Sequence, residues 1–443
     1  MFSTISKAWK IPEIRKRLFF TVLLIVIFRL GTHISVPLVD FAKLKTIMQG
    51  QQEGVLGLIN LITGGAFTRL SIFALSISPY ISASIIVQLL GIIVPSIEMM
   101  AKEGGQQGRD KLSKITKIVT LVLATLQSTG LYLAYSKQGL FENPGTLTAI
   151  TVILTFVTGT MLLTWVGYKI TSKGIGNGIS MLIFAGIIAS LPAALINLTS
   201  KVVVAGELKV GALIGVIAIL IFAILVIAAV VYVHTAERKI PIQYSRKVVG
   251  RKMYGGQNTY IPIKLVMSGV MPVIFASSFM TFPAMLIQIF ASSKIGDPAH
   301  KFINGLYNIS VAPTISNVAG GYLLAHALIF MILIIAFAYF YTFAMYNPVE
   351  IESNIRQSGG YIPGIRTGKS TYEYLNNVIV KLTGFGAICL CAIAVLPMII
   401  NVFTKTNIAL GGTSILIVVG VALESVSQLE AMMKMKRYKG FLE

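Results

Sequence analysis

The sequence predicts an all-α integral membrane protein with ten transmembrane helices. Of its 443 residues, 55% are hydrophobic and only 12% are charged, whereas soluble domains carry about 25% charged residues. Several apolar runs also reach the roughly 20 residues that a helix needs to cross the core of a bilayer. These two observations argue against a water-soluble enzyme.

Ten apolar segments satisfy the length requirement. They cover residues 18–37, 71–95, 115–135, 146–168, 178–198, 210–233, 266–291, 319–346, 374–400 and 408–430. The first segment follows a basic head that imitates a secretion signal. Because its apolar run has full length and no small-x-small motif closes it, we expect an uncleaved helix.

The basic residues predict the orientation of the chain. Lysine and arginine total 37 against 16 acidic residues. If the N-terminus is cytoplasmic, 27 of them fall on the cytoplasmic side and 9 on the opposite side, and Arg29 lies within the first span. Cytoplasmic loops of membrane proteins are enriched in Lys and Arg, so we expect both terminal segments, 1–17 and 431–443, in the cytoplasm.

Two cytoplasmic loops, 234–265 and 346–373, are much longer than ordinary connections of about 4–6 residues. Their prolines and paired glycines predict structured hairpins. The loops are either anchors that follow the positive-inside rule or a docking platform for an acidic protein or RNA surface. The candidate docking residues are Arg238, Lys239, Arg246, Lys247, Arg251, Lys252, Arg356 and Arg366.

Residues 54–70, between the first two spans, form an unusual segment. The run is apolar but too short to span a bilayer, is interrupted by Gly64 and Gly65, and contains Asn60 and Arg69. It is either an external amphipathic turn or a short re-entrant helix in a central cavity, because irregular backbone at membrane depth needs such shelter.

Small polar residues gather in the second, third and seventh spans. One interpretation is that they hold helices together, since such residues commonly do so in membranes. The other is that these three spans line a wet path or a seam that opens. The residues concerned include Ser84, Gln88, Gln127, Ser277, Ser278 and Thr281.

Patterns typical of catalysis or metal binding are missing from the sequence. The glycines of the GxGxG at 174–178 follow a membrane span rather than a strand, so a nucleotide site is not indicated. Arg29 and Glu424 are charged residues within the spans. A small-solute secondary transporter that is coupled to protons or sodium usually binds its ion with carboxylates at mid-membrane. Here Glu424, near the end of the last span, is the carboxylate available, which argues against a transporter. An intramembrane enzyme would need a partner for His326, which we interpret as a packing or hydrogen-bonding residue.

Six stretches closely resemble the SecY family, the channel subunits of the bacterial protein-conducting translocon. They read FRLGTHISVP (28–37), TGGAFTRLSIFALSISPYISASIIVQLL (63–90), GIGNGISMLIFAGIIASLP (174–192), VMPVIFASSF (270–279), GGYIPGIRTG (359–368) and GGTSILIVVGVALE (411–424). Each string alone is only suggestive. Six collinear strings across nearly the whole chain are highly specific.

The resemblance implies two five-helix halves of inverted topology around a central pore. These halves are residues 18–198 and 210–430, joined by a hinge at 199–209. Because five is odd, the second half enters the membrane from the opposite side, as in other inverted repeats. The halves would open like a clamshell, with spans 2 and 3 facing spans 7 and 8 as a lateral gate that includes the six polar residues above.

The resemblance also implies a pore ring of six isoleucines. From pattern alone these side chains would be interpreted as lipid-facing or packing residues. Spacing of i,i+4 places two isoleucines on one helix face, and six branched apolar side chains can narrow a pore to a dewetted constriction. The ring residues are Ile81, Ile85, Ile183, Ile187, Ile274 and Ile417.

Further roles follow from the same resemblance. Segment 54–70 corresponds to the family's plug, with Asn60, Gly64, Gly65 and Arg69 within it. The two basic loops correspond to the docking surface, and Arg366 falls on the arginine of the family's PGIR motif, which is tied to motor coupling.

The expected function is passage of unfolded secretory polypeptides across the membrane and sideways release of apolar segments into lipid, without bond chemistry or a cofactor. The implied partners are the membrane subunits SecE and SecG, the SecA ATPase, the ribosome, secretory preproteins with their signal sequences, and membrane lipids. The expected location is the bacterial plasma membrane, with a thylakoid relative as the alternative.

Overall fold

The computed structural model describes residues 2–40, 42–44, 46, 63–102, 105–141, 143, 145–200, 203–204, 207–208, 210–244, 247–249, 252–254, 258–290, 305, 309, 320–404 and 412–439. In this part of the chain ten helices have 16 residues or more. The first five are α2 (Pro12–Gly31), α5 (Ser78–Ile93), α7 (Gly105–Ser136), α8 (Thr146–Lys173) and α9 (Gly178–Ser200). The second five are α10 (Val210–Thr235), α11 (Met271–Phe290), α13 (Gly320–Met345), α15 (Lys369–Thr404) and α16 (Gly412–Lys439).

These ten helices are the transmembrane helices that the sequence predicts. Among the described residues, six helices are long and apolar enough to span a membrane by length and composition alone, and α5, α9 and α11 contain shorter apolar stretches. Large apolar side chains face outward, as Ile214, Ile224 and Leu225 do on α10. An apolar surface of this kind marks contact with lipid or with another protein, so the chain is a multi-pass membrane protein.

The first span differs from the prediction at both ends. The helix begins at Pro12, a residue suited to the first turn because it needs no N–H partner there, and ends at Gly31 instead of Pro37. Beyond Gly31 the backbone turns to pair with a later segment: the Ile72 N–H donates to the Ile34 carbonyl at 2.9 Å, and the Val36 N–H donates to the Leu70 carbonyl at 3.0 Å. This long-range pairing ends the helix within an apolar run.

The second span starts seven residues later than predicted. Residues 71–77 form turns, and α5 begins at Ser78. Leu70 and Ser76 have φ values of 40° and 50°, in the left-handed region that a helix cannot include. The other eight helices lie close to their predicted positions. Several extend past the apolar window, such as α7 and α15 at their first turns and α16 at its end, because their polar ends continue beyond the bilayer.

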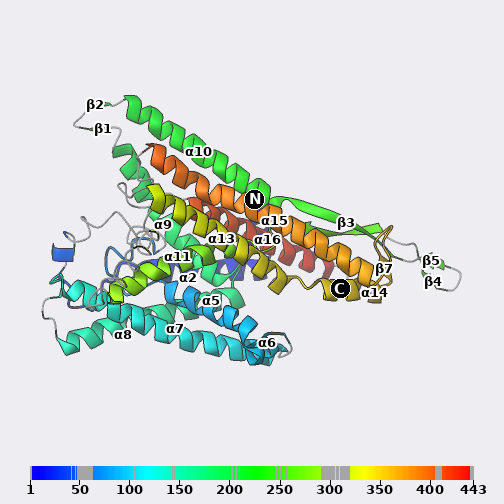
Figure 1. Cartoon of the computed structure of the whole chain (residues 1–443), viewed down its shortest axis with the longest axis horizontal. Helices are drawn as coiled ribbons and strands as arrows, with labels where there is room; N and C mark the ends of the chain where they lie inside the picture. The colour runs from blue at the N-terminus through cyan, green and yellow to red at the C-terminus, as the bar shows by residue number, and fades with distance from the viewer. Residues whose placement is uncertain are drawn as a thin grey trace.

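The two halves meet along two seams. Within the first half α7 packs on α5 and α8, and α8 packs on α9. Within the second half α13 packs on α11 and α15, and α16 packs on α10 and α15. Between the halves, α11 contacts α5 and α7 along one seam, and α9 contacts α16 along the other (Figure 1). One large apolar cluster draws buried side chains from both halves.

A short hairpin connects the halves. Strands β1 (Val203–Val204) and β2 (Glu207–Leu208) pair antiparallel between α9 and α10. Figure 1 places this hairpin at one end of the helices and strand β3 at the other. The hairpin occupies the segment expected to act as the hinge, and that role stays a prediction.

The turn between α8 and α9 depends on a close backbone approach. A Cβ atom on Gly178 would overlap the carbonyl oxygen of Gly167 on the preceding helix. Glycine at this position therefore lets the two helices pack directly against each other. By contrast, a Cβ on Gly215 of α10 would meet nothing within 4 Å.

We expect Gly178→Ala to lower the free energy of unfolding by about 1–3 kcal/mol, as overpacking of a tight contact does. The matched control, Gly215→Ala, should be neutral or stabilising by up to about 1 kcal/mol because alanine is the better helix former. Thermal unfolding of the purified protein in detergent measures both. Equal midpoints for the two variants would contradict the close approach of α8 and α9.

Candidate functional site

The six predicted ring isoleucines lie together in the interior. Their exposed fractions run from 1% to 6%, and all belong to the same apolar cluster. They come from four helices, two in each half: α5, α9, α11 and α16. None of the six faces the lipid side, in contrast to Ile188, the neighbour of Ile187, which is 40% exposed. The structure thus brings together residues that lie up to 336 positions apart in the sequence.

The six side chains of this set are all branched and apolar. Isoleucine side chains offer no hydrogen bond to water or ions, so a narrow passage lined by them dewets. For the same reason they offer no specific bond that would retain a passing polypeptide. On α5 and α9 the paired isoleucines recur at i,i+4 and share one helix face.

The described part of the predicted plug reaches α9, beside this cluster, at Gly64, whereas Phe67 and Leu70 belong to a second apolar cluster. Thr63, Gly64, Ala66, Phe67 and Leu70 are buried, and the segment runs through a series of turns. A Cβ on Gly64 would lie 2.9 Å from the carbonyl oxygen of Gly186, which directly precedes Ile187 in α9.

Two other plug residues differ from Gly64 in environment. Gly65 has open space around it and a φ of 85°, and Arg69 is exposed. Asn60 and the rest of 54–62 lie outside the described residues.

The predicted gate residues belong to α5, α7 and α11, the helices that meet at one seam between the halves, and several of their hydrogen bonds stay within a single helix. The Gln88 amide donates to the Ser84 hydroxyl at 2.8 Å on α5. The hydroxyls of Ser277 and Thr281 donate to carbonyls of α11 at 2.9 Å, and Ser278 lies between them on the same helix. Separation of the helices would leave these three bonds intact, but it would break the hydrogen bond that joins Gln88 to Tyr341 of α13.

Gln127 of α7 differs from its neighbours. Its side chain is buried, and both its amide nitrogen and its amide oxygen lack a hydrogen-bond partner. Burial of an unpaired polar group costs about 1–3 kcal/mol. Contact with water or with a polar partner would therefore lower the free energy of the Gln127 amide.

Two aromatic residues at the seam are missing from the sequence-based prediction. Tyr341 of α13 packs edge-on against Phe275 of α11, with ring centroids 5.2 Å apart, and interacts with Gln88 of α5. It thus connects the fourth helix of the predicted gate to the second span. An apolar run that contains many aromatic residues gives no signal that singles out this tyrosine.

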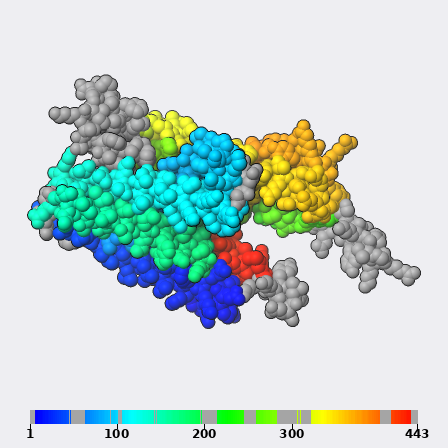
Figure 2. Space-filling model, turned by 90° about the horizontal axis from the view of Figure 1, so that it is seen from below, coloured from blue at the N-terminus to red at the C-terminus, as the bar shows by residue number. Residues whose placement is uncertain are grey.

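The two long basic loops form one structured unit, which we call the platform. Strand β3 (Glu237–Tyr244) pairs antiparallel with β6 (Asn258–Lys264) and with β7 (Gly360–Tyr361), so both loops share one sheet. A second hairpin, formed by β4 (Lys247–Val249) and β5 (Lys252–Tyr254), lies between β3 and β6 in the sequence. These pairings confirm the predicted hairpin in loop 234–265, whereas loop 346–373 folds as a short helix and a strand that joins β3 rather than as a hairpin of its own. The platform lies at one end of the molecule (Figure 2).

An apolar core of its own holds the platform together. Short helix α14 (Pro348–Gln357) begins with Asn347, whose side chain accepts a hydrogen bond from the Val349 N–H. The core then joins the sheet, this helix and the first turns of α15 through Ile240, Ile242, Ile263, Ile355, Ile362, Leu375, Val378 and Ile379. The basic loops are therefore rigid supports rather than flexible tails.

Basic side chains cover the exposed faces of the platform. Arg238, Lys239, Arg356 and Arg366 are all exposed. Lys239 lies over the Tyr260 ring at 4.9 Å, and Arg356 pairs with Glu352 at 3.6 Å. Lys247 and Lys252 belong to the β4–β5 hairpin, whereas Arg246 and Arg251 lie outside the described residues.

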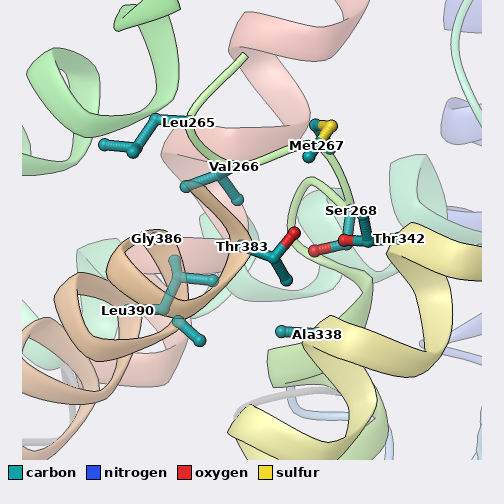
Figure 3. A pocket seen from close by; sticks show the side chains of 10 residues that line it. Leu265, Val266, Met267, Ser268, Ala338, Thr342, Thr383, Gly386 and Leu390 are labelled. Atoms are coloured by element: carbon teal, nitrogen blue, oxygen red, sulfur yellow. The ribbon is translucent and has the colours of Figure 1, made fainter. Parts of the chain in front are cut away.

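A short segment connects the platform directly to α11. Residues 265–270 follow β6 and pass between α13 and α15 before α11 begins. Ser268, Thr342 and Thr383 point there into a small cavity (Figure 3). The hydroxyls of both threonines lack a hydrogen-bond partner, so the connection between the platform and α11 passes a small, mostly apolar pocket into which two unpaired hydroxyls point.

His326 is a packing residue, as expected from the sequence. Its Nδ1 donates to the carbonyl oxygen of Ile309 at 2.7 Å, and its ring lies 5.9 Å from that of Phe330. Within the described residues no group of three or more metal-ligating side chains occurs.

The comparisons with known proteins agree on one family. The sequence model described as SecY matches residues 71–426. A protein translocase subunit SecY of Streptomyces scabiei is 39% identical over the full length of both chains. One from Aquifex aeolicus is 38% identical, again over the full length of both. The chain belongs to the SecY family.

Solved structures show the same fold. A structure described as a protein-conducting channel matches with a TM-score of 0.68 and 20% identity, covering 94% of this chain and 92% of the other. Sec61 in a canine ribosome–channel complex matches with a TM-score of 0.65 and 18% identity, with the same coverage. This SecY-family chain is thus a protein-conducting channel subunit with ten transmembrane helices in two inverted halves, not a small-solute transporter.

We expect Gln127→Leu to raise the free energy of unfolding by about 1–3 kcal/mol, because leucine removes an unpaired buried amide at similar volume. Gln106→Leu is the matched control on the same helix: its side chain is exposed, and the change should stay within about 0.5 kcal/mol. Thermal unfolding in detergent measures both. A lower midpoint for Gln127→Leu would show that the amide stabilises the closed seam.

Proposed function

We propose that the six isoleucines form the constriction through which this channel passes unfolded polypeptides. The observation that carries the proposal is their joint burial in one cluster drawn from both halves. When no polypeptide is present, such a ring can close and exclude ions. It can part around a peptide because no hydrogen bond joins its members. It is the expected meeting point of two funnels.

The lateral gate is proposed along the seam of α5 and α7 with α11 and α13. Bonds within single helices and one unpaired amide support it. Opening at this seam would release apolar segments into lipid. It would retain the hydrogen bonds that Ser84, Ser277 and Thr281 make within their helices and would break the one between Gln88 and Tyr341. The plug role of 54–70 is supported by the burial of Gly64 and its neighbours beside α9.

The platform is the proposed docking surface for a motor or a ribosome. Its shared sheet, apolar core and exposed cations support a rigid, basic binding face, which suits an acidic protein or RNA surface. The proposed partners are SecA, the ribosome, SecE, SecG, and secretory preproteins with their signal sequences. In this scheme the chain carries out no bond chemistry, and energy comes from the docked partner.

The proposed location is the bacterial plasma membrane with both termini in the cytoplasm. The basic platform then faces the cytoplasm, where a motor and ribosomes are available, and the positive-inside asymmetry is satisfied. Membrane lipids would surround the exposed apolar faces of helices such as α10.

Photo-crosslinking from the ring tests the proposed function. A photoreactive residue at Ile187 should crosslink to a stalled secretory chain, whereas the same residue at Ile188, which is exposed on the same helix, should crosslink to lipid instead. We expect the yield of the crosslink to the secretory chain to be at least about tenfold higher at Ile187 than at Ile188. A tenfold ratio corresponds to a free-energy difference of about 1.4 kcal/mol. Equal yields at both positions would reject the pore assignment.

Charge reversal at Arg366 tests the docking surface. We expect Arg366→Glu to reduce motor-driven export at least about tenfold, since like charges across an interface cost several kcal/mol. Folding should persist. The Thr371 hydroxyl donates a hydrogen bond of 2.8 Å to the backbone carbonyl oxygen of Arg366, and the substitution retains this carbonyl. Export assays together with protein abundance measure both effects.

Lys173→Glu is the matched control. Lys173 is basic and exposed at the end of α8, outside the platform, and its reversal should leave export unchanged. A parallel loss of abundance in Arg366→Glu would instead point to a structural role for this arginine.

A further inference from the structure

Arg29, the basic residue within the first span, binds a neutral backbone oxygen. Its guanidinium Nη1 lies 2.6 Å from the carbonyl oxygen of Gly64 and 3.4 Å from the Thr32 hydroxyl. Among the described residues, the ion pairs do not include Arg29. The side chain sits in the last turn of α2, where the negative end of the helix dipole favours a cation. This location explains how the charge is accommodated without a carboxylate.

Gly64 is confined between Arg29 and α9. Its φ is 65°, and a Cβ atom there would lie 2.9 Å from the Gly186 carbonyl oxygen and 3.2 Å from Nη1 of Arg29. Gly186 directly precedes the ring residue Ile187. Gly64, in the described end of segment 54–70, is therefore held close to both the ring-bearing helix α9 and the Arg29 guanidinium.

The Arg29 side of this contact is rigid. The Thr32 hydroxyl donates to the Arg29 carbonyl at 2.7 Å, and Phe28 stacks on Phe73 with ring centroids 6.1 Å apart. The backbone pairing of Ile34 with Ile72 fixes the chain just after the helix. A movement of Gly64 would thus break its bond to Arg29 rather than carry Arg29 along.

A like charge lies close to this bond. Arg69, in the same segment as Gly64, is near enough to repel the Arg29 guanidinium. Release of Gly64 would cost the charge-assisted hydrogen bond, whereas Arg69 precedes Leu70, whose carbonyl stays bonded to the Val36 N–H. The contact therefore has a favourable and an unfavourable part, which is what a reversible attachment requires.

We propose that Arg29 is a positioning residue that latches residues 63–66 beside the ring and so holds the channel closed. The inference rests on the proposed function, because it requires that segment 54–70 acts as the plug. Hydrogen bonds to charged groups are stronger than neutral ones, and loss of this bond should shift the closed–open ratio about tenfold, the equivalent of about 1.4 kcal/mol.

Resting ion conductance of the full-length chain, reconstituted in liposomes with its membrane partners, tests the latch. We expect Arg29→Met to raise conductance about tenfold. Arg29→Lys, which keeps a cation and an N–H donor, should lie near the unaltered protein. Arg17→Met removes the same charge from an exposed position at the other end of α2 and should change nothing. Unchanged conductance in Arg29→Met would overturn the proposal.

Cysteine labelling separates a latch from a loss of fold. Ala66 is 0% exposed, so Ala66→Cys should react slowly with a maleimide in the closed channel and about tenfold faster with Arg29→Met. Native Cys391 is buried in α15 and serves as an internal control once Cys389 is replaced by serine. Faster labelling of Cys391 as well would overturn the latch in favour of a general structural role.

Deletion of residues 54–62 distinguishes the latch from the plug assignment. A rise in conductance on deletion, without a rise in Arg29→Met, would reject the latch and retain the plug. If deletion leaves conductance unchanged, the plug assignment fails. Labelling at Ala66→Cys then still decides whether Arg29 positions residues 63–66.

Discussion

The structure depends on an apolar contact between its two halves, which the proposed channel requires to be both tight and separable. Six isoleucines from α5, α9, α11 and α16 meet in one buried cluster. Dispersion and the hydrophobic effect are non-directional. Such a contact can therefore re-form after displacement without the realignment of specific hydrogen bonds. A ring of hydrogen-bonded residues would bind both water and polypeptide, and would neither seal nor release.

The surroundings of this contact follow the same requirement. At the seam of α5 and α7 with α11, hydroxyls bond within their own helices, whereas the other seam joins α9 to α16. The platform, by contrast, is held by a sheet and a core of its own. Folded units thus border the seam, and residues 265–270 connect the platform to α11, the helix of the proposed gate.

Sequence reasoning located most of the helices because apolar length is a direct physical signal. The failures have one cause: α2 ends at Gly31 and α5 begins at Ser78 where the backbone pairs with a segment distant in sequence. Propensity and hydropathy are local quantities and cannot detect such pairing. The roles of the ring isoleucines likewise came from the family resemblance, since isoleucine on a membrane helix looks the same whether it faces lipid or a pore.

The sequence by itself determined the class of protein, the number of spans, the charge asymmetry between the two sides, and the family. Each of these depends on composition or on short collinear motifs. Only the tertiary structure decided that the isoleucines converge, that both basic loops share one sheet, and that Arg29 binds the Gly64 carbonyl. These are contacts between residues 35 to several hundred positions apart, and their partners are fixed by packing that no local pattern encodes.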